Sequence, residues 1–403
     1  MPVLLSHFID ASRWIGALIV LGVHSTNMFV SLADINTAPH GPLVWLWWFF
    51  VSFNLGHQAV IGFFVLSGYL VGGSVIAGIR EGRDFLREYL IHRMARIYIV
   101  VAPALVLTLV FDSLGRLLFA GAGVYDWPAF ADHFRAVWFL ASLANLQEIW
   151  TPYFGVNGPL WSLACEFWYY LIFPFVLLPF ARNYPARLRW GGFALGVVLL
   201  VVMSIPSGFF KFGAVLWALG GAASMLERPP MRSRYGALAI LAVLLILIRF
   251  FLRGAFLEAH PWLQDATDFV QAAAFLNVLL AIRFGPPEFV GPWAMFRSKT
   301  HVTLANFSFS LYSIHMPLLI FARAGVTAAM GEDWVKQLAT PAHWALLLGV
   351  MALITLTGYA FGTQTEGRTG AARRWLRDRL PFAPPPKQDI QPPPTTRATT
   401  RAV

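Results

Sequence analysis

Charged residues and cysteine are both scarce in this chain. Only 12% of its 403 residues are Asp, Glu, Lys or Arg, whereas about 25% is usual for a soluble domain. The single cysteine, Cys165, excludes an intramolecular disulfide framework, and neither a C-x-x-C motif nor a His/Cys cluster indicates a metal site. With 58% hydrophobic residues, the composition predicts an all-α, polytopic membrane helical bundle without a bound metal or cofactor.

The apolar residues lie in blocks long enough to cross a bilayer. One membrane domain is expected over residues 1–365, and residues 366–403, rich in Pro, Thr and basic side chains, are expected to form a disordered tail. Residues 134–150 are also apolar, but a full span there would reverse every later loop, so we interpret them as re-entrant or interfacial. We predict ten transmembrane helices, at about residues 13–33, 43–77, 97–120, 158–180, 192–206, 207–225, 236–253, 267–284, 302–323 and 342–361.

The positions of the basic residues predict the orientation. The net charge is +10, and eight of the thirty Lys and Arg residues follow Gly367, while most others fall in alternate short loops. The positive-inside rule places these loops and both termini in the cytoplasm. Charge distributed in this way does not support nucleic-acid binding. Residues 82–96 have apolar side chains at helical spacing between arginines, which predicts an amphipathic helix on the cytoplasmic face.

One carboxylate lies inside an apolar, aromatic run. The stretch Asn157–Pro174 reads NGPLWSLACEFWYYLIFP and contains Glu166. A carboxylate at membrane depth is costly unless it is paired or faces a water-filled cavity, so Glu166 is a functional candidate. Its neighbour Cys165 is better explained as a small buried apolar residue than as a nucleophile.

Two basic patterns carry the remaining candidates. Arg13 and His24 lie eleven residues apart in the first predicted helix, about 16 Å along its axis, which places the imidazole near the middle of the membrane. A neutral histidine there accepts a proton from a hydroxyl, and a histidine hydrogen-bonded to a neighbouring helix is an equal alternative. Arg93 and Arg96 share one helix face and suit phosphate oxygens; topology-setting charge or lipid headgroups also explain them.

Five motifs, in this order, resemble those of the acyltransferase-3 family of integral membrane enzymes, over residues 8–320. These are the Arg13/His24 pair, GFFVLSGYL, HRMARI, PLWSLACEFWYYLIFP and FSFSLYSIHMPL. In GFFVLSGYL, Ser67 and Gly68 are expected to serve close helix packing. The chain departs from the family pattern at Gly62, near the usual Asp, at Phe167 in place of a second Glu, and at Phe309 in place of a Tyr. These departures leave the acceptor open.

The resemblance implies an enzyme of the bacterial inner membrane that moves an acyl group, commonly acetyl, from cytoplasmic acyl-CoA to a hydroxyl of a sugar, polysaccharide or glycolipid. His24 would act as a general base or as an acylated intermediate, and Glu166 would orient it, which requires that the two share a cavity. A transporter or flippase for a lipid-linked glycan and a non-catalytic scaffold remain open as alternative functions. Whether the protein forms a homo-oligomer is also open. The implied site comprises catalytic His24 and Glu166; donor-binding Arg13, Arg93 and Arg96; and substrate-binding Asn157, Trp161, Ser162, Tyr312 and His315.

Overall fold

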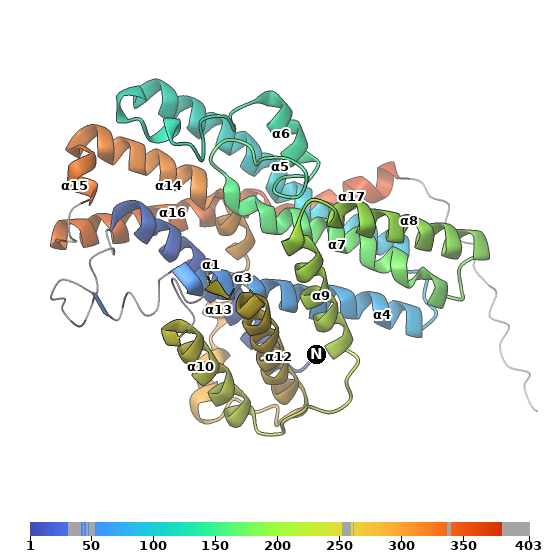
Figure 1. The fold of residues 1–403 in the computed structure, drawn as a ribbon. Helices are drawn as coiled ribbons and strands as arrows, with labels where there is room; N and C mark the ends of the chain where they lie inside the picture. The colour runs from blue at the N-terminus through green and yellow to red at the C-terminus, as the bar shows by residue number, and fades with distance from the viewer. Residues whose placement is uncertain are drawn as a thin grey trace, which may run out of the picture.

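The structure, a computed structural model, describes residues 1–30, 53–251, 259–260, 262–336 and 340–380, with a few positions between 42 and 47. Over these residues the chain is α-helical and forms no β-strand, which confirms the predicted all-α bundle (Figure 1). The main helices are α1 (Val3–Phe29), α3 (Phe53–Ser67), α4 (Gly73–Arg80), α5 (Leu86–Leu118), α6 (Ala136–Leu143), α7 (Trp161–Leu177), α8 (Ala186–Ser204), α9 (Gly208–Ala223), α10 (Arg234–Phe251), α12 (Trp262–Phe284), α13 (Lys299–Ala305), α14 (Ser308–Met330), α15 (Glu332–Lys336), α16 (Pro341–Gln364) and α17 (Thr369–Arg379).

Each of the ten predicted segments contains a helix in the described part of the chain, although residues 48–52 of the second lie outside it. Eight of the described helices are both long and apolar enough to cross a membrane. The other two predicted segments correspond to α9, which has only 16 residues, and to α10. The chain is therefore a multi-pass membrane protein.

Helix α6 lies within residues 134–150, where a full membrane span would reverse the orientation of every later loop. It has eight residues, about 12 Å of helix, whereas the hydrocarbon core of a bilayer is about 30 Å thick. Helix α6 is therefore too short to span a bilayer by itself, which agrees with the re-entrant or interfacial interpretation.

Three local predictions differ from the structure. Helix α1 begins ten residues earlier than predicted, so His24 lies in its last two turns and not near its middle. The amphipathic helix expected at 82–96 is the first part of α5, which continues to Leu118. The predicted tail is helical over 369–379, because long-range contacts that composition does not reveal hold α17 on α5: Arg377 pairs with Glu88 at 2.6 Å. Residues 381–403 lie outside the described part.

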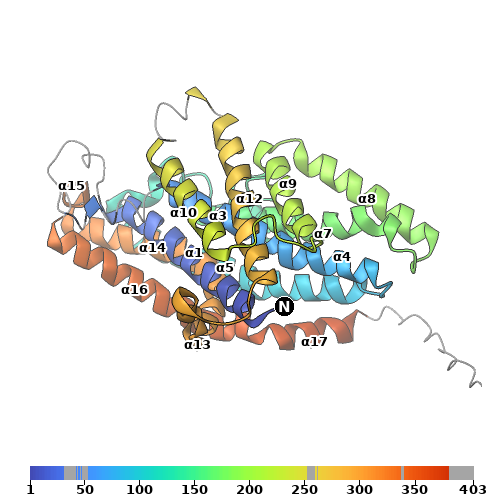
Figure 2. The ribbon, with the colours of Figure 1, turned by 90° about the horizontal axis from the view of Figure 1, so that it is seen from below.

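The helices that bear the candidate residues meet at the centre of the bundle. Helix α14 contacts α1, α5 and α16, while α3 packs on α1 and α9 (Figures 1 and 2). The paired helices α10 and α12 lie below this group in Figure 1, and the paired helices α7 and α8 lie to its right. Residues from α1, α3, α5, α7 and α14 consequently face one another.

The GFFVLSGYL motif brings α3 into close contact with α9. Gly68 begins a π-helical turn, and a Cβ at this position would lie 1.8 Å from the carbonyl oxygen of Trp217. The Ser67 hydroxyl accepts a hydrogen bond from Trp217 Nε1 at 3.0 Å and lies 3.1 Å from the Tyr170 hydroxyl. These contacts agree with the packing role expected of small residues here.

Candidate functional site

Two cavities meet at the centre of the bundle, and Val60 and Tyr312 line both. The first has a volume of about 400 Å³ and is called here the arginine cavity, because Arg13, Arg93, Arg96 and Arg373 line it. The second, of about 550 Å³, is called the histidine cavity, because His24 and His57 line it. The site is thus divided into a cationic half and an imidazole-containing half.

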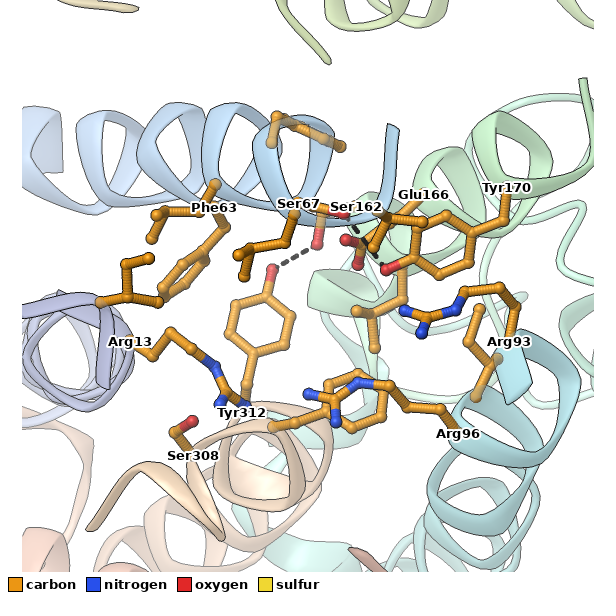
Figure 3. A pocket seen from close by; sticks show the side chains of 18 of the residues that line it. Arg13, Phe63, Ser67, Arg93, Arg96, Ser162, Glu166, Tyr170, Ser308 and Tyr312 are labelled. Atoms are coloured by element: carbon orange, nitrogen blue, oxygen red, sulfur yellow. Dashed lines mark hydrogen bonds between the residues drawn. The ribbon is translucent and has the colours of Figure 1, made fainter. Parts of the chain in front are cut away.

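The arginine cavity brings together the three arginines that the sequence selected. Figure 3 shows Arg13 reaching in from α1, and Arg93 and Arg96 from α5. The buried Glu366 carboxylate lies 3.5 Å from Arg13 Nη2 and 3.7 Å from Arg96 Nη2, and it also accepts the backbone N–H of Ser310 at 3.3 Å. Glu366 therefore holds two of the guanidinium groups in place.

A fourth arginine enters the cavity from the C-terminal helix. Arg373 on α17 lines the cavity together with the three predicted arginines. Helix α17 is held on α5 by the Arg377–Glu88 ion pair and by Arg87, whose Nη2 donates to the carbonyl oxygens of Arg377 and Leu380 at 3.1 and 2.8 Å. Sequence reasoning missed Arg373 because the tail composition indicated disorder.

Glu166 lies in the arginine cavity. Its carboxylate is beside the hydroxyl of Tyr170, which in turn contacts Ser67 (Figure 3). Arg93 lies over the Tyr170 ring, 5.7 Å from its centroid. A buried carboxylate is tolerated where opposite charge faces it, so the arginines account for the presence of Glu166 at this depth.

Tyr312 stands between the two cavities. Its hydroxyl lies 2.7 Å from Ser162 Oγ and donates to the carbonyl oxygen of Pro159 at 3.0 Å. Ser162 lines the arginine cavity, whereas the adjacent Trp161 lines the histidine cavity. The first turn of α7 and Tyr312 of α14 thus form part of the partition.

His24 is oriented by His315. The Nδ1 atom of His24 lies 2.8 Å from Nε2 of His315, and the two rings are stacked at an interplanar angle of 15°. His315 is 1% exposed, and its Nδ1 lies 2.6 Å from the carbonyl oxygen of Tyr312. A carbonyl only accepts, so His315 Nδ1 carries the proton and its Nε2 accepts from His24 Nδ1. This network leaves His24 Nε2 with a lone pair.

The expectation that His24 and Glu166 share a cavity is wrong. They line adjacent cavities, and the partner of the His24 ring is His315. Glu166 lies one helical turn beyond Ser162 on α7, on the face that lines the arginine cavity. Helix α7 therefore places Trp161 in the wall of the histidine cavity and Glu166 in the wall of the arginine cavity.

Asn157 is part of the framework and not of a cavity wall. It is 1% exposed, and its Nδ2 donates to Thr108 Oγ1 and to the carbonyl oxygen of Ser313, both at 3.0 Å. Next to it, the N–H of Val156 donates to the buried Asp112 carboxylate at 3.0 Å. Neither Asn157 nor His315 is among the described residues that line the arginine or the histidine cavity, so their role in binding a substrate stays a prediction.

Glu148 and Tyr153 line the histidine cavity from the loop before α7. Burial raises the pKa of Glu148, and the nearby His133 partly opposes this. Burial also raises the pKa of Tyr153 to about 12. Tyr153 is therefore a hydrogen-bond donor at neutral pH, and it donates to the carbonyl oxygen of Ala129 at 2.7 Å.

His57, which also lines the histidine cavity, is paired with a carboxylate. His57 Nε2 lies 2.7 Å from Asp268 Oδ2. Sequence reasoning missed this pair although each member is an ionisable residue in an apolar segment, which is itself a signal. The described residues contain no group of three or more His, Cys, Asp or Glu that could hold a metal ion.

Known proteins agree with the motifs. The acyltransferase-3 profile, described as an acyltransferase domain, matches residues 6–361. Acyltransferase MdmB of Streptomyces mycarofaciens is 25% identical over 404 positions, which cover 94% of this chain and 95% of that protein. A Staphylococcus aureus protein named "putative O-acetyltransferase" is 22% identical over 299 positions, which cover 67% of this chain but only 47% of that protein. This chain thus matches about half the length of the second relative.

No solved structure is significantly similar to this chain. The family assignment instead rests on a profile match across nearly the whole membrane domain and on a relative aligned over almost its full length. The chain belongs to the acyltransferase-3 family and is a membrane O-acyltransferase.

Proposed function

We propose that this enzyme binds acyl-CoA, with acetyl-CoA as the first donor to test, through the arginine cavity and transfers the acyl group to a hydroxyl of a sugar, polysaccharide or glycolipid in the histidine cavity. The enzyme would lie in the bacterial inner membrane with both termini and the arginine cavity on the cytoplasmic side. The observation that carries the proposal is the meeting of a four-arginine cavity and a histidine cavity at Tyr312.

The arginine cavity suits the phosphates of coenzyme A. Arginine forms paired, charge-assisted hydrogen bonds with phosphate oxygens, and its guanidinium remains charged when partly buried. Arg93, Arg96 and Arg373 would contact the phosphates at the mouth, and Arg13 would be released from Glu366 to join them. The pantetheine arm then extends along the cavity toward Tyr312, so that the thioester approaches His24.

The lone pair on His24 Nε2 accounts for the chemistry. Nε2 takes the proton of the acceptor hydroxyl, the hydroxyl oxygen attacks the thioester carbonyl, and the C–S bond breaks. The departing sulfur then takes the proton from His24, which returns to the neutral form. His315 accepts from Nδ1 throughout and keeps the ring oriented. In the competing route Nε2 itself attacks the thioester and an acyl-His24 intermediate passes the group to the acceptor.

The position of Glu166 in the arginine cavity gives it a different role from the orientation of His24 that the sequence suggested. On the donor side it faces the arginines and Tyr170 and would set their positions, not that of His24. The transporter, flippase and scaffold alternatives lose their support, because the chain belongs to a family of acyltransferases.

The test uses purified enzyme in lipid nanodiscs with labelled acetyl-CoA and glycans extracted from a deletion strain. His24→Ala should lose transfer while retaining CoA binding and an unchanged elution volume. Cys165→Ala, a substitution of another buried residue, should transfer at the wild-type rate. Transfer by His24→Ala at the wild-type rate would exclude the proposal. Mass spectrometry of the enzyme with acetyl-CoA alone distinguishes the two routes, since only the covalent one leaves an acyl group on His24.

A further inference from the structure

The amide of Gln58 is buried without a hydrogen-bond partner. Gln58 on α3 is 5% exposed, and no described residue forms a hydrogen bond with its Nε2 or its Oε1. Its side chain lines the histidine cavity. Buried polar groups in proteins are nearly always satisfied, and an exception calls for a partner that the chain does not supply. Because Gln58 lines the cavity, a molecule bound there could supply that partner.

His57, the residue before Gln58, presents a second polar group to the same cavity. The Asp268 carboxylate, 2% exposed, lies 2.7 Å from His57 Nε2 and accepts from Gln264 Nε2 at 2.9 Å. Because a carboxylate only accepts, His57 Nε2 carries its proton, and Asp268 orients both partners. His57 and Gln264 line the same cavity as His24. The proton transfer proposed for His24 uses neither of them.

We propose that Gln58 and His57, with Asp268 and Gln264 as support, form a subsite that binds the non-reacting hydroxyls of a polyhydroxylated acceptor while His24 acts on the reacting one. The inference rests on the proposed function and adds specificity-determining residues to it. A hydroxyl both donates and accepts, so two neighbouring hydroxyls satisfy Gln58 Oε1 and Nε2 together. A simple alcohol has one hydroxyl, which His24 engages, and leaves the amide unsatisfied.

The size and the remaining walls of the cavity fit such an acceptor. Its volume of about 550 Å³ lies within the range of sites for small organic ligands. Trp161 lines the cavity as well and offers an aromatic face beside the polar groups. Sites that hydrogen-bond a substrate hydroxyl strongly reject analogues that lack it, because their own polar groups are then left unpaired.

The experiment compares two acceptors with the same alkyl chain, octyl glucoside and octanol, using labelled acetyl-CoA and enzyme in nanodiscs. Wild type should acylate octyl glucoside with the higher kcat/KM. Gln58→Leu should lower kcat/KM for octyl glucoside at least about tenfold and leave that for octanol unchanged. Asp268→Asn, which frees His57 and Gln264, should produce the same selective loss. Gln58→Met covers the case in which the leucine variant does not fold.

Gln271→Leu is the matched control. Gln271 is also 5% exposed and lies on the neighbouring α12, where its Nε2 donates to the carbonyl oxygen of Gln58. Its Oε1, like the amide of Gln58, has no partner among the described residues, but Gln271 does not line the cavity. Its substitution should leave the preference for octyl glucoside intact. Equal kcat/KM of wild type and Gln58→Leu for octyl glucoside, or an equal loss for both acceptors, would overturn the subsite. His24→Ala tests the proposed function separately, because it should abolish transfer to both acceptors.

Discussion

His24 and Glu166 line different cavities, and Tyr312 lines both. The imidazole faces the larger cavity with its ring held by His315, and the carboxylate faces the arginines. In the proposed function, His24 therefore acts on the acceptor side of the reaction and Glu166 lies on the donor side, so the two do not form a catalytic pair.

His315 should matter through the tautomer of His24. In His315→Phe the Nδ1–H of His24 has no acceptor, so the tautomer with the proton on Nδ1 is no longer favoured and Nε2 can carry the proton instead. The kcat should therefore fall by about 10²-fold or more. His315→Gln offers a side-chain oxygen to Nδ1–H and should retain more activity. Steady-state kinetics give the comparison, and CoA binding should be equal in both variants. Equal kcat values for wild type and His315→Phe would contradict the orienting role.

Arg373 should contribute to donor binding although it lies beyond the residues that match the family profile. Arg373→Gln should raise KM for acetyl-CoA about tenfold, the expected effect of one lost charge-assisted hydrogen bond, and leave kcat nearly unchanged. Arg374→Gln makes the same charge change at an exposed position on α17 and should have little effect. CoA titrations at low and high salt measure the difference. Equal effects of the two substitutions would show that only general charge attraction is involved.

Tyr312 should limit the access of water to the thioester. Tyr312→Ala removes the ring from the partition, joins the two cavities and should increase hydrolysis of acetyl-CoA in the absence of an acceptor. Tyr312→Phe retains the ring and loses only the contacts with Ser162 and Pro159, so hydrolysis should stay low while stability falls by about 1 kcal/mol. A thiol-release assay follows hydrolysis. Low hydrolysis by the alanine variant would contradict the role of the ring as a barrier.

Gly155 should be required for the loop that precedes α7. Its φ is +60°, and a Cβ there would lie 2.2 Å from Asp112 Oδ2, the acceptor of the Val156 N–H. Gly155→Ala should therefore destabilise the protein by more than the roughly 1 kcal/mol expected for a left-handed residue alone. Gly123→Ala is the control, since Gly123 has φ +67° and no atom within 4 Å of the added Cβ. Thermal unfolding in detergent compares them, and equal losses would argue against the Asp112 contact.

The sequence by itself determined the helical bundle, the approximate positions of its ten predicted membrane segments and the family. Runs of apolar residues and the order of motifs are both properties of the linear sequence, so they can be identified without knowing how the helices pack. Arg13, Arg93 and Arg96, which the sequence suggested for donor binding, do line one cavity, and i,i+3 spacing explains why two of them share a face. Their binding of the donor stays a prediction.

Only the tertiary structure decided which groups meet. His24 and His315 are 291 residues apart, and His57 and Asp268 are 211 apart, and no periodicity along the chain encodes which helices pack together. The same holds for Arg373, whose helix is held on the distant α5 by the Arg377–Glu88 ion pair and by hydrogen bonds from Arg87. A side chain's chemistry belongs to its own residue, whereas its hydrogen-bond partner and the cavity it faces depend on helix packing. That is why the sequence named His24 and Glu166 but could not separate them.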